Sequence, residues 1–260
     1  LGLTMTNYQF ANPNYRFIGL DNFTRLFQDE KFVIAIKNTL LYLTAVPVSL
    51  IGAFLVAVAL NRSVFLKSML RSMYFMPYIT SGVAVGFVWM LLFQPSQGPI
   101  NGVLRALGMD NPPGWFASTD TAMLALNIIA VWASLGYNMI IYMAALQGVP
   151  AALKEAALLD GANPWQQFWH VIFPMIRHAV TICVFWTLNS GFQVFDVIYS
   201  LTGGGPGRAT QSTAMNIFEE AFRGNVRYGY ATAKSTVLFA IVLVITIIQI
   251  RAMQKKEQEA

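Results

Sequence analysis

Charged side chains are scarce in this sequence: Asp, Glu, Lys and Arg make up 11% of the 260 residues, and hydrophobic residues make up 56%. Soluble domains carry about 25% charged residues, so this composition argues against an ordinary soluble domain and indicates a membrane protein. The formal net charge of +5 includes no basic run longer than Lys255-Lys256, and nucleic acid is therefore not an expected partner.

Cysteine is nearly absent as well. The single thiol, Cys183, cannot form an intramolecular disulfide, and it lies in an apolar run with no base close by in the sequence. An initiator methionine and a signal peptide are also lacking, because the sequence opens at Leu1 with a polar stretch. We therefore expect that the natural chain begins upstream of Leu1.

Long apolar runs are abundant, at residues 38–60, 73–93, 121–146, 179–201 and 232–250. A helix of about 20 apolar residues crosses the hydrocarbon core of a bilayer. Within these runs only Asp196 and Lys234 are charged, and both lie near an end. Lipid offers the backbone no hydrogen-bond partners, so each run should be a helix. The sequence predicts an all-α polytopic membrane protein with a single transmembrane domain over residues 1–260.

Basic residues at the ends of the runs give a weak indication of orientation. The connection 61–72, "NRSVFLKSMLRS", is the densest basic linker, and short cytoplasmic linkers tend to be basic. Because successive spans alternate in direction, the loop 147–175 and the C-terminal end should lie on the same side as this linker. Residues 94–120 and 202–231 should then lie outside.

The loop 147–175 contains a polar, turn-forming interruption, "EAALLDGANPWQQFWHVIFP" at residues 155–174. Residues 151–159 are mostly strong helix formers, and Asp160-Gly161 is typical of a helix end. Asn163-Pro164 is a helix start, and Pro174 should end this second helix. Helices of about nine residues cannot cross a bilayer. The hairpin either docks on a partner or merely connects two spans.

Polar side chains recur at helical spacing on the third and fourth runs, so that each run has one polar face. The candidates for a substrate pathway are Asn138 and Tyr142 in the third run and Asn189, Gln193 and Asp196 in the fourth. Amides can exchange hydrogen bonds with sugar hydroxyls, and aromatic rings can cover the apolar face of a sugar. The alternative is that these groups form hydrogen bonds between packed helices.

The hairpin is similar at eight positions to the EAA loop of ABC-importer membrane subunits. These positions are Glu155, Ala156, Ala157, Asp160, Gly161, Ala162, Phe168 and Pro174. Three further stretches resemble the maltose-type and glycerol-phosphate-type sugar permeases, namely "FIGLDNF" at 17–23, "SMYFMPY" at 72–78 and "TGGGP" at 202–206. The resemblance is to the first permease of the pair. It implies six core spans, so we expect one more span before Leu1.

This resemblance implies that the loop is cytoplasmic and forms coupling helices on an ATP-hydrolysing subunit. It also implies a second, homologous permease, two ATPase subunits, an extracytoplasmic substrate-binding protein and surrounding lipids, in a bacterial or archaeal plasma membrane. The chain has no Gly-x-x-x-x-Gly-Lys-Ser/Thr sequence, so ATP and magnesium should bind the partner ATPase and no cofactor should bind here. We expect a non-catalytic permease without a metal site.

The charge of the spans leads to an expectation about the substrate. A phosphorylated or acidic substrate would need cationic partners along its path, and Lys234 is the one cation in the five runs. We therefore expect import of a neutral sugar or oligosaccharide by alternating access. A glycerol phosphate or another polyol is the alternative, and a self-sufficient secondary transporter or channel is a weaker one, because it would require ionisable groups in mid-span.

Overall fold

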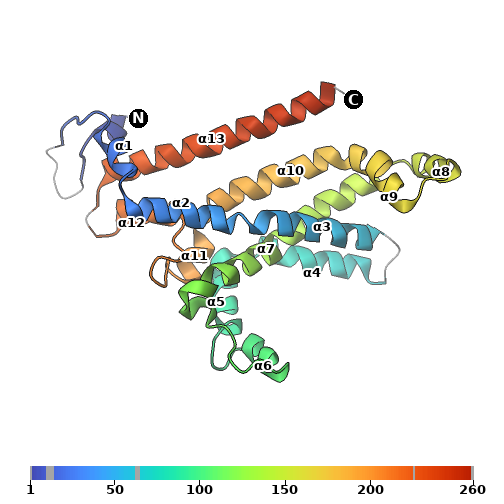
Figure 1. The fold of residues 1–260 in the computed structure, drawn as a ribbon, viewed down its shortest axis with the longest axis horizontal. Helices are drawn as coiled ribbons and strands as arrows, with labels where there is room; N and C mark the ends of the chain where they lie inside the picture. Colours follow the sequence, from blue (N-terminus) through green and yellow to red (C-terminus); the bar gives the residue numbers. More distant parts are fainter. Residues whose placement is uncertain (1, 10–14, 62–64, 225, 259–260) are drawn as a thin grey trace. The chain divides into compact units, whose positions relative to one another are not determined.

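The computed structural model describes residues 2–9, 15–61, 65–224 and 226–258, and its regular elements in these ranges are helices (Figure 1). The pairing of Thr6 with Phe17 is an isolated bridge. The all-α prediction is thus confirmed. The helices fall into two compact units, each made of three stretches of the chain.

The first unit comprises Leu1–Thr44, Ser81–Ile129 and Asn189–Ile248. Its elements are η1 (Gly2–Met5), α1 (Asp21–Leu26), α2 (Glu30–Tyr42), α5 (Gly82–Leu92), α6 (Pro99–Ala106), η2 (Trp115–Ala117), α11 (Asp196–Leu201) and α12 (Thr213–Phe222). One apolar core joins α5, α11 and the first part of α7 (Thr119–Gln147) around Phe93, Trp115 and Leu126.

The second unit comprises Ala45–Thr80, Ala130–Leu188 and Gln249–Ala260. Its elements are α3 (Ala45–Asn61), α4 (Lys67–Ile79), α8 (Ala151–Leu159), α9 (Pro164–Gln167) and the π-turn η3 (Phe168–Ile172). Three long helices have residues in both units, namely α7 (Thr119–Gln147), α10 (Phe173–Phe192) and α13 (Tyr228–Gln258). The core of the second unit gathers α3, α7 and α10 around Ala57, Met139 and Cys183.

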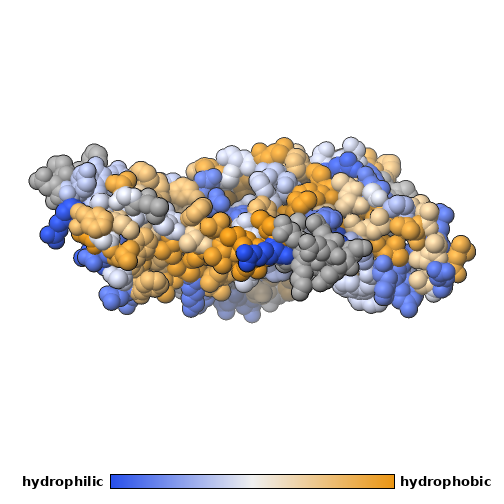
Figure 2. All heavy atoms as spheres, turned by 90° about the horizontal axis from the view of Figure 1, so that it is seen from above, coloured by the Kyte–Doolittle hydropathy of each residue, from blue (hydrophilic) through white to orange (hydrophobic). Residues whose placement is uncertain are grey.

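Four helical runs are long and apolar enough to cross a membrane: Glu30–Asn61, Thr119–Gln147, Pro164–Phe192 and Tyr228–Arg251. They contain the predicted spans 38–60, 121–146 and 232–250. Large apolar side chains are exposed along them, such as Leu55 on α3 and Phe239 on α13. Figure 2 shows hydrophobic atoms covering much of one face of the molecule. Such a surface is costly in water and suits a lipid environment.

The predicted span 73–93 is not one continuous helix. Helix α4 ends at Ile79, and the next two residues, Thr80 and Ser81, are extended, with ψ of 142° and 130°. Pro77 lies inside α4, near its end, and weakens the last turns of this helix, because proline has no N–H to donate to the carbonyl four residues earlier. The Thr80 hydroxyl donates a hydrogen bond to the Met76 carbonyl at 2.8 Å. Helices α4 and α5 together are still apolar enough for a fifth span.

The single helix predicted over 179–201 is wrong, because α10 ends at Phe192 and α11 begins only at Asp196. The last turn tightens, with the Gln193 and Val194 amides bonded three residues back. The Val194 carbonyl is freed by the break, and it accepts a hydrogen bond from the Ser212 hydroxyl at 2.8 Å. A distant side chain therefore stabilises this helix end, which the local sequence could not reveal.

Pro174 also differs from expectation, since it does not end the helix that begins at Pro164. The chain forms a π-turn just before it, in which the Phe173 amide bonds to the Phe168 carbonyl, and the helix then continues to Phe192. A π-turn shifts the hydrogen-bond pattern by one residue, which accommodates a residue without an N–H group. Proline is in this case the second residue of α10.

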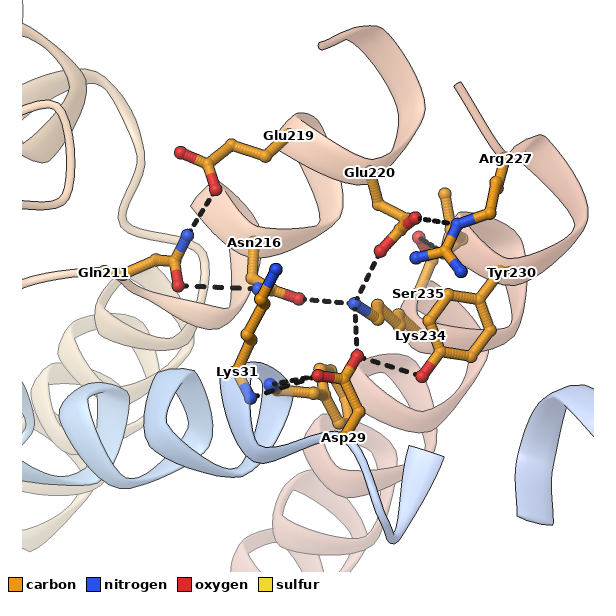
Figure 3. Close-up of polar contacts among 12 residues, drawn as sticks. Asp29, Lys31, Gln211, Asn216, Glu219, Glu220, Arg227, Tyr230, Lys234 and Ser235 are labelled. Atoms are coloured by element: carbon orange, nitrogen blue, oxygen red, sulfur yellow. Dashed lines mark hydrogen bonds and ion pairs between the residues drawn. The ribbon is translucent and has the colours of Figure 1, made fainter. Parts of the chain in front are cut away.

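A buried lysine ties three helices of the first unit together (Figure 3). Lys234 on α13 has 1% of its side chain exposed. Its ammonium lies 2.9 Å from a carboxylate oxygen of Asp29 and 2.9 Å from one of Glu220, and it donates a hydrogen bond to Asn216 at 2.8 Å. Asp29 precedes α2, and Asn216 and Glu220 lie on α12. These residues form the Lys234 network.

Asp29 has two roles in the Lys234 network. Its carboxylate accepts hydrogen bonds from the Lys31 and Phe32 amides, which caps α2, and from the Tyr230 hydroxyl at 2.9 Å. Burial alone would raise the pKa of Asp29, but the bond and charge of Lys234 outweigh it and lower the pKa. The stability that the ionised Asp29 contributes is therefore present at neutral pH and is lost as the pH falls through its lowered pKa.

We predict that Lys234→Met lowers the free energy of unfolding by roughly 3 kcal/mol, because the buried carboxylates lose their shared cation. The matched control is Lys37→Met, which removes an exposed lysine from α2. Thermal unfolding of the purified protein in detergent measures both. Equal melting temperatures for the two variants would show that the network does not hold the unit together.

Candidate functional site

The hairpin of residues 151–173 is built from local signals. Helix α8 ends in a Schellman motif, in which the Ala162 amide bonds to the Ala157 carbonyl at 2.9 Å and the Gly161 amide to Leu158 at 3.0 Å. Gly161 has a φ of +78°, a left-handed conformation that glycine adopts without strain. The Asp160-Gly161 helix end is therefore confirmed.

The second helix of the hairpin starts with a capping box. The Asn163 side chain accepts from the Gln166 amide, and the Gln166 side chain accepts from the Asn163 amide, both at 2.9 Å. The Gln167 side chain then donates to the Lys154 carbonyl at 2.9 Å, which ties α9 to α8. Phe168 lies 5.6 Å from Phe54 between ring centres and anchors the hairpin to α3. The hairpin is thus held in one shape.

The outer side of this hairpin remains uncovered, and none of the residues of α8 is buried. Of the eight motif positions, Glu155, Ala156, Asp160, Gly161 and Pro174 are exposed, and Ala157, Ala162 and Phe168 are half-buried. Large apolar side chains beside them are exposed too: 89% of Leu159 and 69% of Trp165. Apolar groups held outward on a rigid frame are typical of a docking surface.

Asn138 and Tyr142 lie in the core of the second unit. Asn138 is fully buried and exchanges hydrogen bonds with Thr187 on α10 at 3.1 and 3.2 Å. Tyr142 is 2% exposed and its ring meets Phe54 edge-on at 5.6 Å. Neither side chain reaches a surface that a substrate could touch in this structure. Hydrogen bonding between packed helices, the alternative for Asn138, accounts for its contacts.

Asn189, Gln193 and Asp196 belong to the first unit and do not share one helix. Asn189 lies in the last turn of α10 and is half-buried, Gln193 follows the end of that helix, and Asp196 opens α11. Gln193 and Asp196 are exposed. The helical face predicted for these three residues is therefore interrupted at Phe192, although two of the side chains remain accessible.

An aromatic row that the sequence reasoning missed crosses three helices of the second unit. Tyr78 on α4 stacks on Tyr137 on α7, with centroids 4.7 Å apart, and Tyr137 lies 5.5 Å from Trp186 on α10. Tyr78 and Trp186 are 38% and 43% exposed. The sequence contained a signal, because Tyr137 and Trp186 lie well inside their predicted runs, where an interfacial aromatic belt would not place them.

Among the residues that the structure describes, no three His, Cys, Asp or Glu side chains gather as a possible metal site. Cys183 is buried, and its thiol contacts the Asn138 carbonyl at 3.9 Å.

Residues 45–255 match the family model of the binding-protein-dependent transport system inner membrane component. The chain belongs to this family. It is 36% identical to the probable starch degradation products transport system permease protein AmyD of Thermoanaerobacterium thermosulfurigenes, over 94% of this chain and 82% of that protein. It is 33% identical to the sn-glycerol-3-phosphate transport system permease protein UgpA of Agrobacterium fabrum, over 92% of this chain and 82% of that protein.

A solved structure has the same fold. The chain is similar to one from a bacterial ABC transporter involved in the import of the acidic polysaccharide alginate, with 26% identity and a TM-score of 0.81, over 98% of this chain and 87% of that one. This permease is therefore a multi-pass, non-catalytic membrane component of a binding-protein-dependent importer. The expected family resemblance and function class are confirmed.

We predict that Asn138 and Thr187 act as a pair that holds α7 to α10. Asn138→Ala and Thr187→Ala should each lower the melting temperature. The free energy of unfolding lost in the double variant should be about 0.6 kcal/mol smaller than the sum of the two single losses. The control is Gln147→Ala, which removes an exposed amide from the end of the same helix. If Asn138→Ala impaired uptake and left the melting temperature unchanged, Asn138 would line the substrate pathway after all.

Proposed function

We propose that this permease forms half of the translocation pathway of an ATP-driven importer and that its substrate is a neutral saccharide. Its hairpin of residues 151–173, within the loop 147–175, docks on an ATPase subunit at the cytoplasmic side. The complete importer contains a second permease, two ATPase subunits that bind ATP and magnesium, and an extracytoplasmic binding protein. The pathway alternates its access as the helices rock about a site inside the membrane.

The observation that carries this proposal is the rigid hairpin with its uncovered apolar side. A Schellman turn, a capping box and the Gln167–Lys154 bond fix its shape, while Leu159 and Trp165 stay exposed. A loop that only connected two spans would not need a fixed shape or exposed leucines. A hairpin that transmits force to a partner requires both, since a soft connection would absorb the motion.

We predict that Gly161→Asp uncouples transport from ATP hydrolysis. The turn has φ of +78°, which strains a residue with a side chain, but the space around it is open. The new carboxylate would therefore meet no other atom of the permease and would project a charge into the docking surface. The purified complex should lose its ATPase subunits, and uptake should fall at least about tenfold, as for a charge buried without a partner.

Two variants serve as controls for Gly161→Asp. Gly161→Asn tests the same left-handed turn without the charge and should retain more activity. Gly108→Asp places a charge at another open turn, with φ of +93°, in the predicted external loop 94–120, and should leave coupling intact. Normal retention of the ATPase and normal uptake in Gly161→Asp would contradict docking through this hairpin.

A saccharide suits the aromatic row better than a phosphate ester does. Partly exposed Tyr78, Tyr137 and Trp186 offer flat apolar surfaces, on which a sugar ring can stack. Lys234, the single cation of the predicted spans, already neutralises Asp29 and Glu220. An anionic substrate would find no spare cation in the predicted spans. Glycerol phosphate is the second candidate, because three relatives carry that substrate in their names.

We predict that Tyr137→Ala raises the transport KM for the saccharide about fivefold to tenfold, because stacking contributes about 0.5–1.5 kcal/mol for each ring. Tyr137→Phe should retain most of the affinity, since the ring remains. The control is Trp132→Ala, an aromatic on the same helix that is 41% exposed and outside the row. Equal KM values for Tyr137→Ala and Trp132→Ala in uptake assays would show that the aromatic row does not contact the substrate.

A further inference from the structure

A cavity of about 430 Å³ lies in the first unit, next to the Lys234 network. Four cationic side chains line it, namely Lys31, Arg208, Arg223 and Arg227, together with the carboxylates of Glu219 and Glu220. They come from the first turn of α2, the loop between α11 and α12, helix α12, and the segment before α13. Each of these segments lies at or outside the end of a predicted span.

Both carboxylates of this cavity are already engaged. Glu220 contacts Lys234 at 2.9 Å and Arg227 at 2.6 Å, and Glu219 accepts a hydrogen bond from the Gln211 side chain. The cavity and the network beneath it together contain five cations and, with Asp29, three carboxylates. Two positive charges are therefore in excess, and a negatively charged group in the cavity would balance them.

Arg208 and Lys31 carry this excess. One terminal nitrogen of Arg208, Nη1, is buried and has no hydrogen-bond partner among the described residues. The backbone of Arg208 is held in place, because its carbonyl accepts a hydrogen bond from Asn38 at 2.8 Å. Figure 3 shows the Lys31 side chain rising from α2 towards Asn216. A buried guanidinium donor without an acceptor is costly, and a carboxylate would satisfy it with two parallel bonds.

We propose that this cavity receives a carboxylate side chain of the extracytoplasmic binding protein. This inference rests on the proposed function, which supplies such a partner. Along the chain, α10, the apolar part of one candidate span, lies between the hairpin of residues 151–173 and the segment that contains Arg208. A cytoplasmic hairpin therefore places the cavity on the outer side. Because the proposed substrate is neutral and the ATPase subunits lie on the cytoplasmic side, we assign the carboxylate to the binding protein, the partner that approaches from the outer side.

The first test measures docking of the binding protein to the complete importer in lipid nanodiscs. Arg208→Gln and Lys31→Gln should each raise the docking Kd about tenfold and weaken its dependence on salt, because each removes one charge contact. Lys37→Gln removes an exposed lysine from the same helix as Lys31 but outside the cavity, and should leave docking unchanged. Unchanged Kd values in both cavity variants would overturn the proposal.

The second test identifies the chemical group directly. A carbodiimide joins a carboxylate to an amine that it touches, as an amide with loss of water, so the docked complex should yield a peptide linked from Lys31 to an Asp or Glu of the binding protein. Mass spectrometry should find this link in the wild type and in Lys37→Gln, and not in Lys31→Gln. A link to Lys37 and none to Lys31 would place docking elsewhere.

Two further outcomes separate this proposal from the function on which it rests. If Arg208→Gln kept the wild-type docking Kd and raised the transport KM of a carboxylated saccharide, the cavity would serve the substrate and the proposal would be overturned. If the wild-type importer did not bind its binding protein at all, the proposed function would fail together with this inference. Failure of the cavity variants alone leaves the proposed function intact.

Discussion

The need to satisfy backbone polar groups within the chain governs this fold, since lipid supplies no hydrogen bonds. Continuous helices meet that need by themselves, and each interruption requires a substitute partner. The Ser212 hydroxyl serves the Val194 carbonyl after α10, and the Asn38 amide serves the carbonyls of Arg208 and Gln211. The polar side chains of the first unit are therefore concentrated where the helices break, and the charged cavity is built around one of these places.

The two units differ in the kinds of side chain that form their main features. The first unit contains the Lys234 network, in which a buried cation binds α2, α12 and α13 through two carboxylates. The second contains the aromatic row and the hairpin of residues 151–173, which Ile172 and the contact of Phe168 with Phe54 join to an apolar core. Charged side chains within the predicted spans are thus limited to Asp196 and Lys234 near the span ends, while the other surfaces within the spans are aromatic, polar but uncharged, or aliphatic. This separation favours a neutral substrate.

Local signals in the sequence were sufficient for the hairpin and for three of the five spans. Asp160-Gly161 and Asn163-Pro164 act through neighbouring backbone groups, and so a reader of the sequence can place them. The helix end at Phe192 depends on Ser212, the contacts of Asn138 depend on Thr187, and Lys234 pairs with Asp29 from the far end of the chain. Partners so distant in sequence leave no periodic pattern, and so the sequence showed the polar residues but not the groups that they contact.

The most direct test of this account is uptake into proteoliposomes that contain the purified importer. With the binding protein outside and ATP inside, a labelled neutral oligosaccharide should accumulate against its gradient, and omitting either one should abolish accumulation. An ion gradient alone should drive no uptake, since the predicted spans hold no mid-span relay and Lys234 is fixed by its two carboxylates. Accumulation driven by a proton or sodium gradient without ATP would contradict the account.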